Sequence, residues 1–202
     1  MDKIHDAPTS QSEATADTLA AALEREHREI DRGIEAFLVG RAEGQPQTEP
    51  LARAIEALRR HIFLEEHFVF PPLRDAGLVA PIFVMLREHG EIWGTLDVLD
   101  AQLIANPDAA AMSEICDMLL EQLARHNAKE EPILYSQTDA VLTTAAGADL
   151  RAFLAAGRRP DRWVCAQAGT GPRHGGRRDR PLNPISRRAC LGCASVHPVA
   201  FA

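Results

Sequence analysis

Apolar residues recur at spacings of three and four in four consecutive segments between residues 15 and 140. This spacing places them on one face of an α-helix, and the segments are separated by short stretches rich in Gly, Pro, Asn or Asp, which favour turns. The pattern predicts an all-α fold in which residues 15–140 form an antiparallel up-down four-helix bundle. Residues 1–14 are predicted to be a disordered N-terminal arm, and residues 141–202 an Arg/Gly/Pro-rich C-terminal tail that is mostly disordered.

Capping and helix-breaking residues indicate where the four helices begin and end. Pro71–Pro72 should end the second helix, and Pro132 should perturb the last turns of the fourth, because proline has no N–H to donate. The first helix should begin near Thr15 or Asp17, and the second beyond Thr48, with Pro50 in its first turn. The third should begin near Val79 or Pro81 and end near Asn106–Pro107, and the fourth should begin near Asp108 or Ser113.

Ionisable residues interrupt the apolar face near the middle of all four helices. They are His27, His61, Glu65, His89, His126 and Glu130. Such side chains are costly to bury unless something pairs with them. The pairs His61–Glu65 and His126–Glu130 have HxxxE spacing, so each offers an imidazole and a carboxylate from one helix face. Two such pairs facing each other favour a site for two metal ions.

The donor set also limits the choice of metal. Imidazole and carboxylate donors without a thiolate fit iron, manganese or zinc. A helical bundle whose core holds two metal ions bridged by glutamates is an established way of building a di-iron site. Metal ions would stabilise the buried charges.

These residues, together with the stretches HIFLEEHFVFPPL and HNAKEEPILYS, resemble the hemerythrin-like (HHE cation-binding) domain family over roughly residues 16–140. The resemblance implies a cofactor of two non-haem iron ions (Fe2+/Fe3+), with Glu65 and Glu130 as bridging carboxylates. The implied iron ligands are His27, His61, Glu65, His89, His126 and Glu130.

One position departs from the pattern of the oxygen-carrying hemerythrins, which have a second histidine four residues after the one on the third helix. Here that position is Trp93. We therefore expect six protein ligands and one coordination position open to water, hydroxide, oxygen, nitric oxide or peroxide. We also expect the indole to lie over the metal pair.

Neighbouring residues have structural interpretations beside the functional ones. Glu66 and Glu131 follow the bridging candidates and turn about 100° away on a helical wheel, so a solvated or supporting role is expected. Tyr135 is close enough in sequence to hydrogen-bond a bound oxygen species, although a half-buried core tyrosine is the commoner case. Cys116 should pack as a small apolar residue. A lone core histidine is more often hydrogen-bonded than ligating, so the metal hypothesis depends on the six residues as a set.

Charge and composition restrict the partners and the compartment. The net charge of −7 divides into −15 for residues 1–150 and +8 for residues 151–202, and the acidic part argues against nucleic acid as a partner. The polar N-terminus does not resemble a signal peptide, and no apolar run approaches the roughly 20 residues of a membrane span. We expect a cytoplasmic protein that does not associate with membranes and has no structural disulfide.

The tail carries a second, weaker pattern. Cys190, Cys193 and His197 form CxxCxxxH, which could contribute to a zinc site with a fourth ligand such as Cys165 or His174. A flexible extension is the simpler interpretation, and an Arg-rich tail could also bind nucleic acid or an acidic partner.

Three classes of function remain. The leading one is a binding protein that senses, stores or delivers iron, or binds oxygen or nitric oxide, in stress response or iron-centre repair, as the family resemblance implies. The second is a di-iron enzyme that decomposes peroxide or reduces nitric oxide. The third is a helical partner-binding domain without metal. No Gly-rich phosphate loop or nucleophile motif indicates another enzyme class, and the sequence identifies no protein or redox partner.

Overall fold

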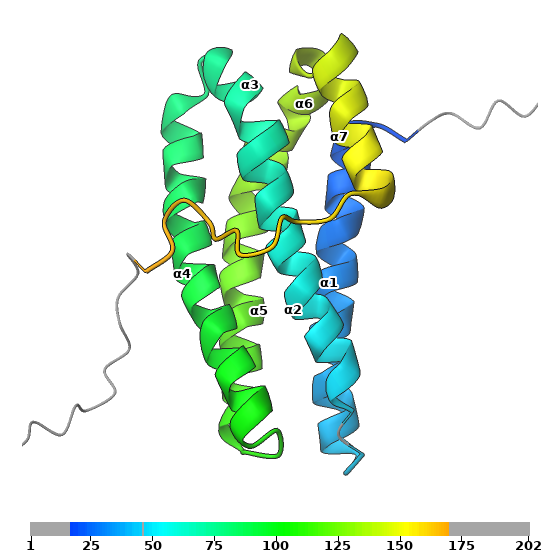
Figure 1. The fold of residues 1–202 in the computed structure, drawn as a ribbon, viewed down its shortest axis with the longest axis vertical. Coiled ribbons are helices and arrows are strands. Elements are labelled where there is room, and N and C mark those ends of the chain that lie inside the picture. The colour runs from blue at the N-terminus through cyan, green and yellow to red at the C-terminus, as the bar shows by residue number, and fades with distance from the viewer. Residues whose placement is uncertain (1–16, 46, 170–202) are drawn as a thin grey trace, which may run out of the picture. The chain divides into compact units, whose positions relative to one another are not determined.

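The computed structural model describes residues 17–45 and 47–169, in which every regular element is a helix. Four long helices run alongside one another in Figure 1: α1 (Leu19–Ala42), α2 (Thr48–Leu64), α4 (Val79–Ala105) and α5 (Ala111–Glu130). Helix α1 packs against α2 and α5, and α4 packs against the same two helices. The all-α prediction is confirmed for this part of the chain, while the predicted arm, residues 1–14, lies outside it. None of the helices described is long and apolar enough to cross a membrane.

Two of the long helices continue through π-helical turns into short helices. The added elements are η1 (Glu65–Val69) and α3 (Phe70–Asp75) after α2, and η2 (Glu131–Tyr135) and α6 (Ser136–Val141) after α5. Across each turn a backbone N–H donates to the carbonyl five residues earlier, from Phe70 to Glu65 and from Ser136 to Glu131. Single π turns of this kind are frequent at functional sites. Here η1 begins at Glu65, the last residue of one HxxxE pair, and η2 directly follows Glu130, the last residue of the other.

The π turns explain why one prediction about proline is wrong. Pro71–Pro72 do not end the second helical segment, which continues to Asp75. The π turn shifts the hydrogen-bond register, so that the two prolines fall in the first turn of α3. The N–H groups of a first turn have no partner within the helix, so the N–H that proline lacks costs no hydrogen bond there. Pro132 lies inside η2, so its perturbation of the fourth helix takes the form of a π turn and not of a helix end.

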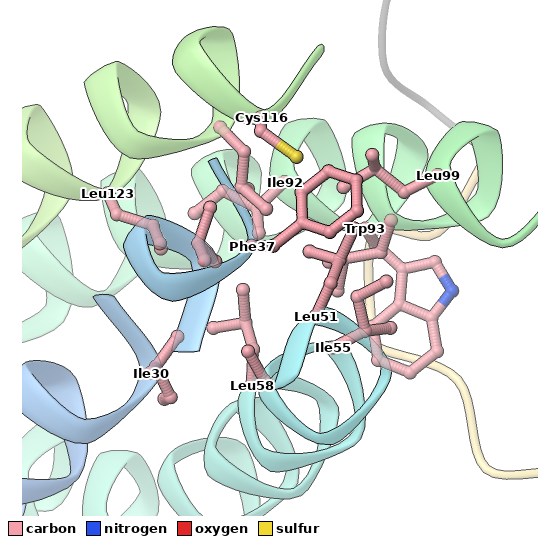
Figure 2. Close-up of a cluster of buried hydrophobic side chains, with 14 of the residues drawn as sticks. Ile30, Phe37, Leu51, Ile55, Leu58, Ile92, Trp93, Leu99, Cys116 and Leu123 are labelled. Carbon is pink, nitrogen blue, oxygen red and sulfur yellow. The ribbon is translucent and has the colours of Figure 1, made fainter. Parts of the chain in front are cut away.

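The interior consists of two hydrophobic clusters, and the interrupting polar residues lie where they meet. In α1, Leu19 and Leu23 belong to one cluster, whereas Ile30 and Ile34, beyond His27, belong to the other. Figure 2 shows the second of these clusters. The order of the two clusters along the chain reverses from each long helix to the next. The polar residues of all four helices therefore lie at one level of the core.

Residues 141–169 differ from the prediction of a mostly disordered tail. Most of them form α7 (Thr144–Ala156) and an extended segment, residues 157–169, which crosses α2 and α4 (Figure 1). The remainder of the predicted tail, with Cys190 and Cys193, lies outside the described residues.

Packing against the rest of the molecule explains why these residues are ordered. Leu150 and Phe153 of α7 and Cys165 of the extended segment are buried, and Trp163 packs against both hydrophobic clusters. Helix α7 has 13 residues with only three large apolar side chains (Leu150, Phe153 and Leu154), and a helix of that length is marginal without tertiary contacts. Its stability comes from contacts that the local sequence does not encode.

Candidate metal centre

The six side chains predicted as metal ligands are brought together at the level where the two clusters meet. Each is 5% exposed or less. Their donor atoms form two groups, within each of which all atoms lie within 4.8 Å of one another. The groups are Glu65, His89, His126 and Glu130, and His27, His61 and Glu65. Glu65 belongs to both, which is the position that a bridging carboxylate would need.

All four histidines have the same orientation, with Nε2 toward this centre and Nδ1 toward a glutamate outside it. The Nδ1–glutamate distances are 3.0 Å for His27 and Glu131, 2.8 Å for His61 and Glu26, 2.9 Å for His89 and Glu66, and 3.2 Å for His126 and Glu88. A carboxylate can only accept, so each Nδ1 carries the proton and each Nε2 is left to bind something else. Metal-binding histidines in proteins have this arrangement.

These four outer glutamates (Glu26, Glu66, Glu88 and Glu131) connect the helices in a cycle. Glu26 of α1 is hydrogen-bonded to the histidine of α2, and Glu66 of η1 to the histidine of α4. Glu88 of α4 is hydrogen-bonded to the histidine of α5, and Glu131 of η2 to the histidine of α1. The supporting role expected for Glu66 and Glu131 is what the structure shows. The sequence did not suggest such a role for Glu26 and Glu88, although each directly precedes a predicted ligand histidine in an EH dipeptide.

Four buried atoms at the centre have no hydrogen-bond partner among the described residues. They are Glu65 Oε2, His89 Nε2 and both carboxylate oxygens of Glu130. Glu65 Oε2 lies 3.2 Å from His89 Nε2, and Glu130 Oε2 lies 3.2 Å from His126 Nε2, but neither pair has hydrogen-bond geometry. Buried polar atoms are normally satisfied, so lone pairs that converge without meeting a donor fit a cation between them. The residues present therefore fit a metal site.

Tyr135 is the functional candidate that the sequence analysis undervalued. Its side chain is 1% exposed, and its hydroxyl donates to Glu65 Oε1. The hydroxyl oxygen lies 3.0 Å from His61 Nε2 and 3.1 Å from His27 Nε2, which are themselves 3.0 Å apart. In a regular α-helix a residue five positions after Glu130 would point elsewhere, but the π turn η2 brings Tyr135 toward the centre. The irregular turn is the signal that helical spacing alone could not supply.

Trp93 does not lie over the centre, contrary to the expectation. Its indole is one of the apolar side chains of the cluster in Figure 2, where it meets Trp163 edge-on and lies under the guanidinium of Arg59. The small cavity at the centre is lined by other residues: His27, Ile30, Asp31, Leu58, His61, Ile62, Glu65, His89, Ile92, Leu123, His126 and Asn127. Its volume is about 10 Å3, close to the minimum that holds one water molecule.

Proton positions in the absence of metal follow from burial and the neighbouring carboxylates. Burial lowers the pKa of His61, but Glu65 and Glu26 outweigh burial and raise it to about 10. The same balance, with Glu130 and Glu88 as the carboxylates, raises the pKa of His126 to about 10. Without metal, protons on these two imidazoles neutralise the buried carboxylates, and a metal cation would replace them.

Comparisons with known proteins were made by three searches. Residues 15–138 match the family model described as the hemerythrin HHE cation binding domain. Neither the search of curated proteins nor the search of solved structures found a match.

We expect the metal-free protein to lose thermal stability as the pH rises from 7 toward 10. The pKa of His61 is about 10 in the folded protein and about 6.5 in the unfolded chain. A raised pKa stabilises the fold fully below the unfolded value, and the contribution is lost as the pH rises through the folded value. Melting curves of chelator-treated protein across this range test the expectation. His61→Gln should flatten the dependence and exposed His67→Gln should not; a wild-type midpoint that is level or rising would contradict it.

Proposed function

The chain belongs to the hemerythrin HHE cation-binding domain family, and we propose that it is a non-haem di-iron binding protein with the family's antiparallel four-helix bundle. Three observations support this proposal. The family match covers residues 15–138. The polar residues of four long helices lie at one level of the core, and the order of the hydrophobic clusters reverses from helix to helix.

The observation that carries the proposal is the set of unpaired atoms at the centre. Glu65 and Glu130 are 1% and 0% exposed, and three of their four carboxylate oxygens have no hydrogen-bond donor among the described residues. A partner-binding domain without metal would gain nothing from this arrangement, because apolar residues of similar volume would pack there without the desolvation penalty. The proposed ligands are those predicted from the sequence: His27, His61, Glu65, His89, His126 and Glu130.

Each neighbouring residue has a separate task in this proposal. The outer glutamates hold the Nδ1 protons, so that every Nε2 is available to the metal. Tyr135 can hold a proton between His27, His61 and Glu65, or lose it and become a seventh ligand. Apolar cavity residues such as Ile30, Leu58 and Leu123 limit access to the smallest molecules. Bound iron would supply two adjacent Lewis-acid and redox centres.

The biological role we infer is the binding of iron, oxygen or nitric oxide in the cytoplasm, in stress response or iron-centre repair. The small cavity favours ligands with only two or three non-hydrogen atoms. A sensor, a store and an iron donor share the same ligands and differ in how quickly metal is released. Iron release rates and stopped-flow mixing of the ferrous protein with oxygen or nitric oxide would separate these roles.

A second candidate, decomposition of hydrogen peroxide, is favoured by two side chains at the cavity. Asp31 and Asn127 both line it, and each has a buried Oδ1 atom without a hydrogen-bond partner among the described residues. Two unpaired acceptors favour a ligand that brings its own donors, which hydrogen peroxide does and oxygen, nitric oxide and azide do not. Burial raises the pKa of Asp31 to about 6, with Glu35 and Glu131 adding to the effect. Asp31 can therefore exchange a proton near neutral pH.

The first test of this proposal is metal content. Purified wild-type protein should hold about two irons per chain, because two bridging carboxylates with four imidazoles make a two-metal site. Glu65→Ala or Glu130→Ala should each lower the ratio below about one by removing a bridge. Glu121→Ala, an exposed glutamate on the same helix as Glu130, is the matched control and should keep both irons. Full retention by both bridge variants would refute the assigned ligands.

The second test separates peroxide from ligands that lack hydrogen-bond donors. In the iron-loaded protein, Asp31→Leu should slow peroxide consumption about tenfold, the effect of losing roughly 1.4 kcal/mol of hydrogen bonding. Azide affinity, measured from the ferric absorption spectrum, should remain within a factor of about two, because the carboxyl offers azide no special contact. Asp31→Asn should retain part of the peroxide rate because its amide oxygen still accepts.

Glu29→Leu serves as the control for this experiment, since Glu29 is an exposed carboxylate on the same helix. It should match the wild type for both ligands. A wild-type protein that consumes no peroxide would leave the binding role alone, and equal losses of azide and peroxide in Asp31→Leu would contradict the acceptor argument.

A further inference from the structure

The segment 157–169 makes a direct hydrogen bond to one of the outer glutamates. The backbone N–H of Ala166 donates to Glu66 Oε2 at 2.8 Å, while Glu66 Oε1 accepts from His89 Nδ1 at 2.9 Å. The two oxygens of one carboxylate thus join the segment to a proposed metal ligand. This contact comes from beyond residue 138, where the family match ends.

The segment is seated at the same level of the molecule by large side chains and a glycine. Trp163 meets both Phe63 and Trp93 edge-on, which fixes the segment across α2 and α4. Gly90, the residue after His89, allows the backbone to approach. A Cβ atom at Gly90 would lie 2.6 Å from the carbonyl oxygen of Gln167, a distance that real Cβ atoms do not tolerate. Only a residue without a side chain allows the segment to dock here.

A second connection reaches the centre from the C-terminal end of α7. Arg60 donates to the carbonyls of Phe153 and Gly157 at 2.7 and 2.9 Å and to Glu26 Oε1 at 2.6 Å. Glu26 Oε2 in turn accepts from His61 Nδ1 at 2.8 Å. The residues after the family domain are therefore linked to the outer glutamates of two proposed ligands, directly to Glu66 and through Arg60 to Glu26.

We propose that residues 144–169 contribute to metal binding at the centre. Docking of segment 157–169 and metal binding at His89 strengthen each other through Glu66. This inference rests on the proposed di-iron function. Glu66 acts as a positioning residue, because it holds the Nδ1 proton of His89 and is itself fixed by Ala166. A coupling between two binding events is reciprocal, so the factor by which docking raises metal affinity is the factor by which metal favours docking.

The main experiment compares two alanine substitutions in α4 of the full-length protein. Gly90→Ala places a methyl group against Gln167, whereas Gly94→Ala meets no atom within 4 Å. Both replace a helical glycine by alanine and should gain similar helix stability. Ferrous iron affinity, measured under nitrogen by competition with a chelator, should fall about tenfold or more in Gly90→Ala alone, the usual effect of losing an outer partner of a ligand.

A second pair removes only the hydrogen bond to Glu66. Ala166 is the second residue of the turn closed by the bond from Ala168 N–H to the Cys165 carbonyl, a position that favours proline. Ala166→Pro should therefore keep the turn but delete the donor, while Ala166→Ser keeps the N–H. Iron affinity should fall in the proline variant and match the wild type in the serine variant.

Docking itself can be followed without iron chemistry, through the buried thiols. Cys165 lies on the segment and is 3% exposed, and Cys116 lies in the core and is 0% exposed. Peptide-resolved labelling with a thiol reagent should therefore report release of the segment at Cys165 and global unfolding at Cys116. Iron should slow labelling of Cys165 by about the factor found for affinity. Gly90→Ala should accelerate labelling at Cys165 but not at Cys116.

The outcomes distinguish this inference from the function on which it rests. If the wild type binds no iron, the proposed function fails and the coupling falls with it. If iron binds equally tightly to all four variants, or leaves Cys165 labelling unchanged, only the coupling is refuted. Reduced affinity in Gly90→Ala and Ala166→Pro alone, with iron-dependent protection of Cys165, would establish it.

Discussion

Burial of four imidazoles and two carboxylates at one level of the core is the constraint on which the rest of this structure depends. Every one of these side chains is 5% exposed or less, so bulk solvent cannot satisfy them there. A protein interior stabilises such groups only through protons, hydrogen bonds or cations. Without metal, protons on His61 and His126 balance the carboxylate charges, as the raised pKa values of these two histidines indicate, but three carboxylate oxygens remain without a donor among the described residues. A cation bound between these oxygens would supply the partner that they lack.

The outer glutamates show how a short sequence pattern can organise four helices. A glutamate beside a ligand lies about 100° around the helix from it and so faces the neighbouring helix instead of the centre. Glu66 therefore holds the histidine of α4, and Glu131 holds that of α1. Because each helix supports the ligand of the next, the geometry of the centre depends on all four being packed together. The orientation of each of these histidines therefore depends on the packing of its helix against the neighbouring helix.

Helical periodicity was sufficient to predict the six buried polar residues and the four long helices, because a mid-helix histidine on an apolar face has only the core to point into. The third predicted helix, from Val79 or Pro81 to near Asn106–Pro107, corresponds closely to α4. Periodicity failed where the helix is irregular or the contact is distant. After the π turn η1, the helix continues through Pro71–Pro72 as α3. Helix α7 and segment 157–169 are ordered by contacts with residues that are distant in the sequence. No local signal distinguishes such a segment from a flexible tail.

The number of protein ligands was the least predictable property, and Tyr135 and Trp93 show why. Sequence spacing placed Trp93 over the centre, but its large apolar ring is better satisfied against Trp163 and under Arg59 than beside buried carboxylates. Tyr135 is displaced by a π turn toward His27 and His61, where its hydroxyl meets two imidazoles and a carboxylate. Whether the centre has an open coordination position therefore depends on whether this phenol keeps its proton. Burial raises the pKa of Tyr135 well above its usual value, and the glutamates raise it further. A metal cation at the same place would act in the opposite direction, because it favours the deprotonated form of every oxygen beside it. In the proposed centre, the protonation state of this hydroxyl, and not the identity of residue 93, would therefore determine whether a coordination position is open.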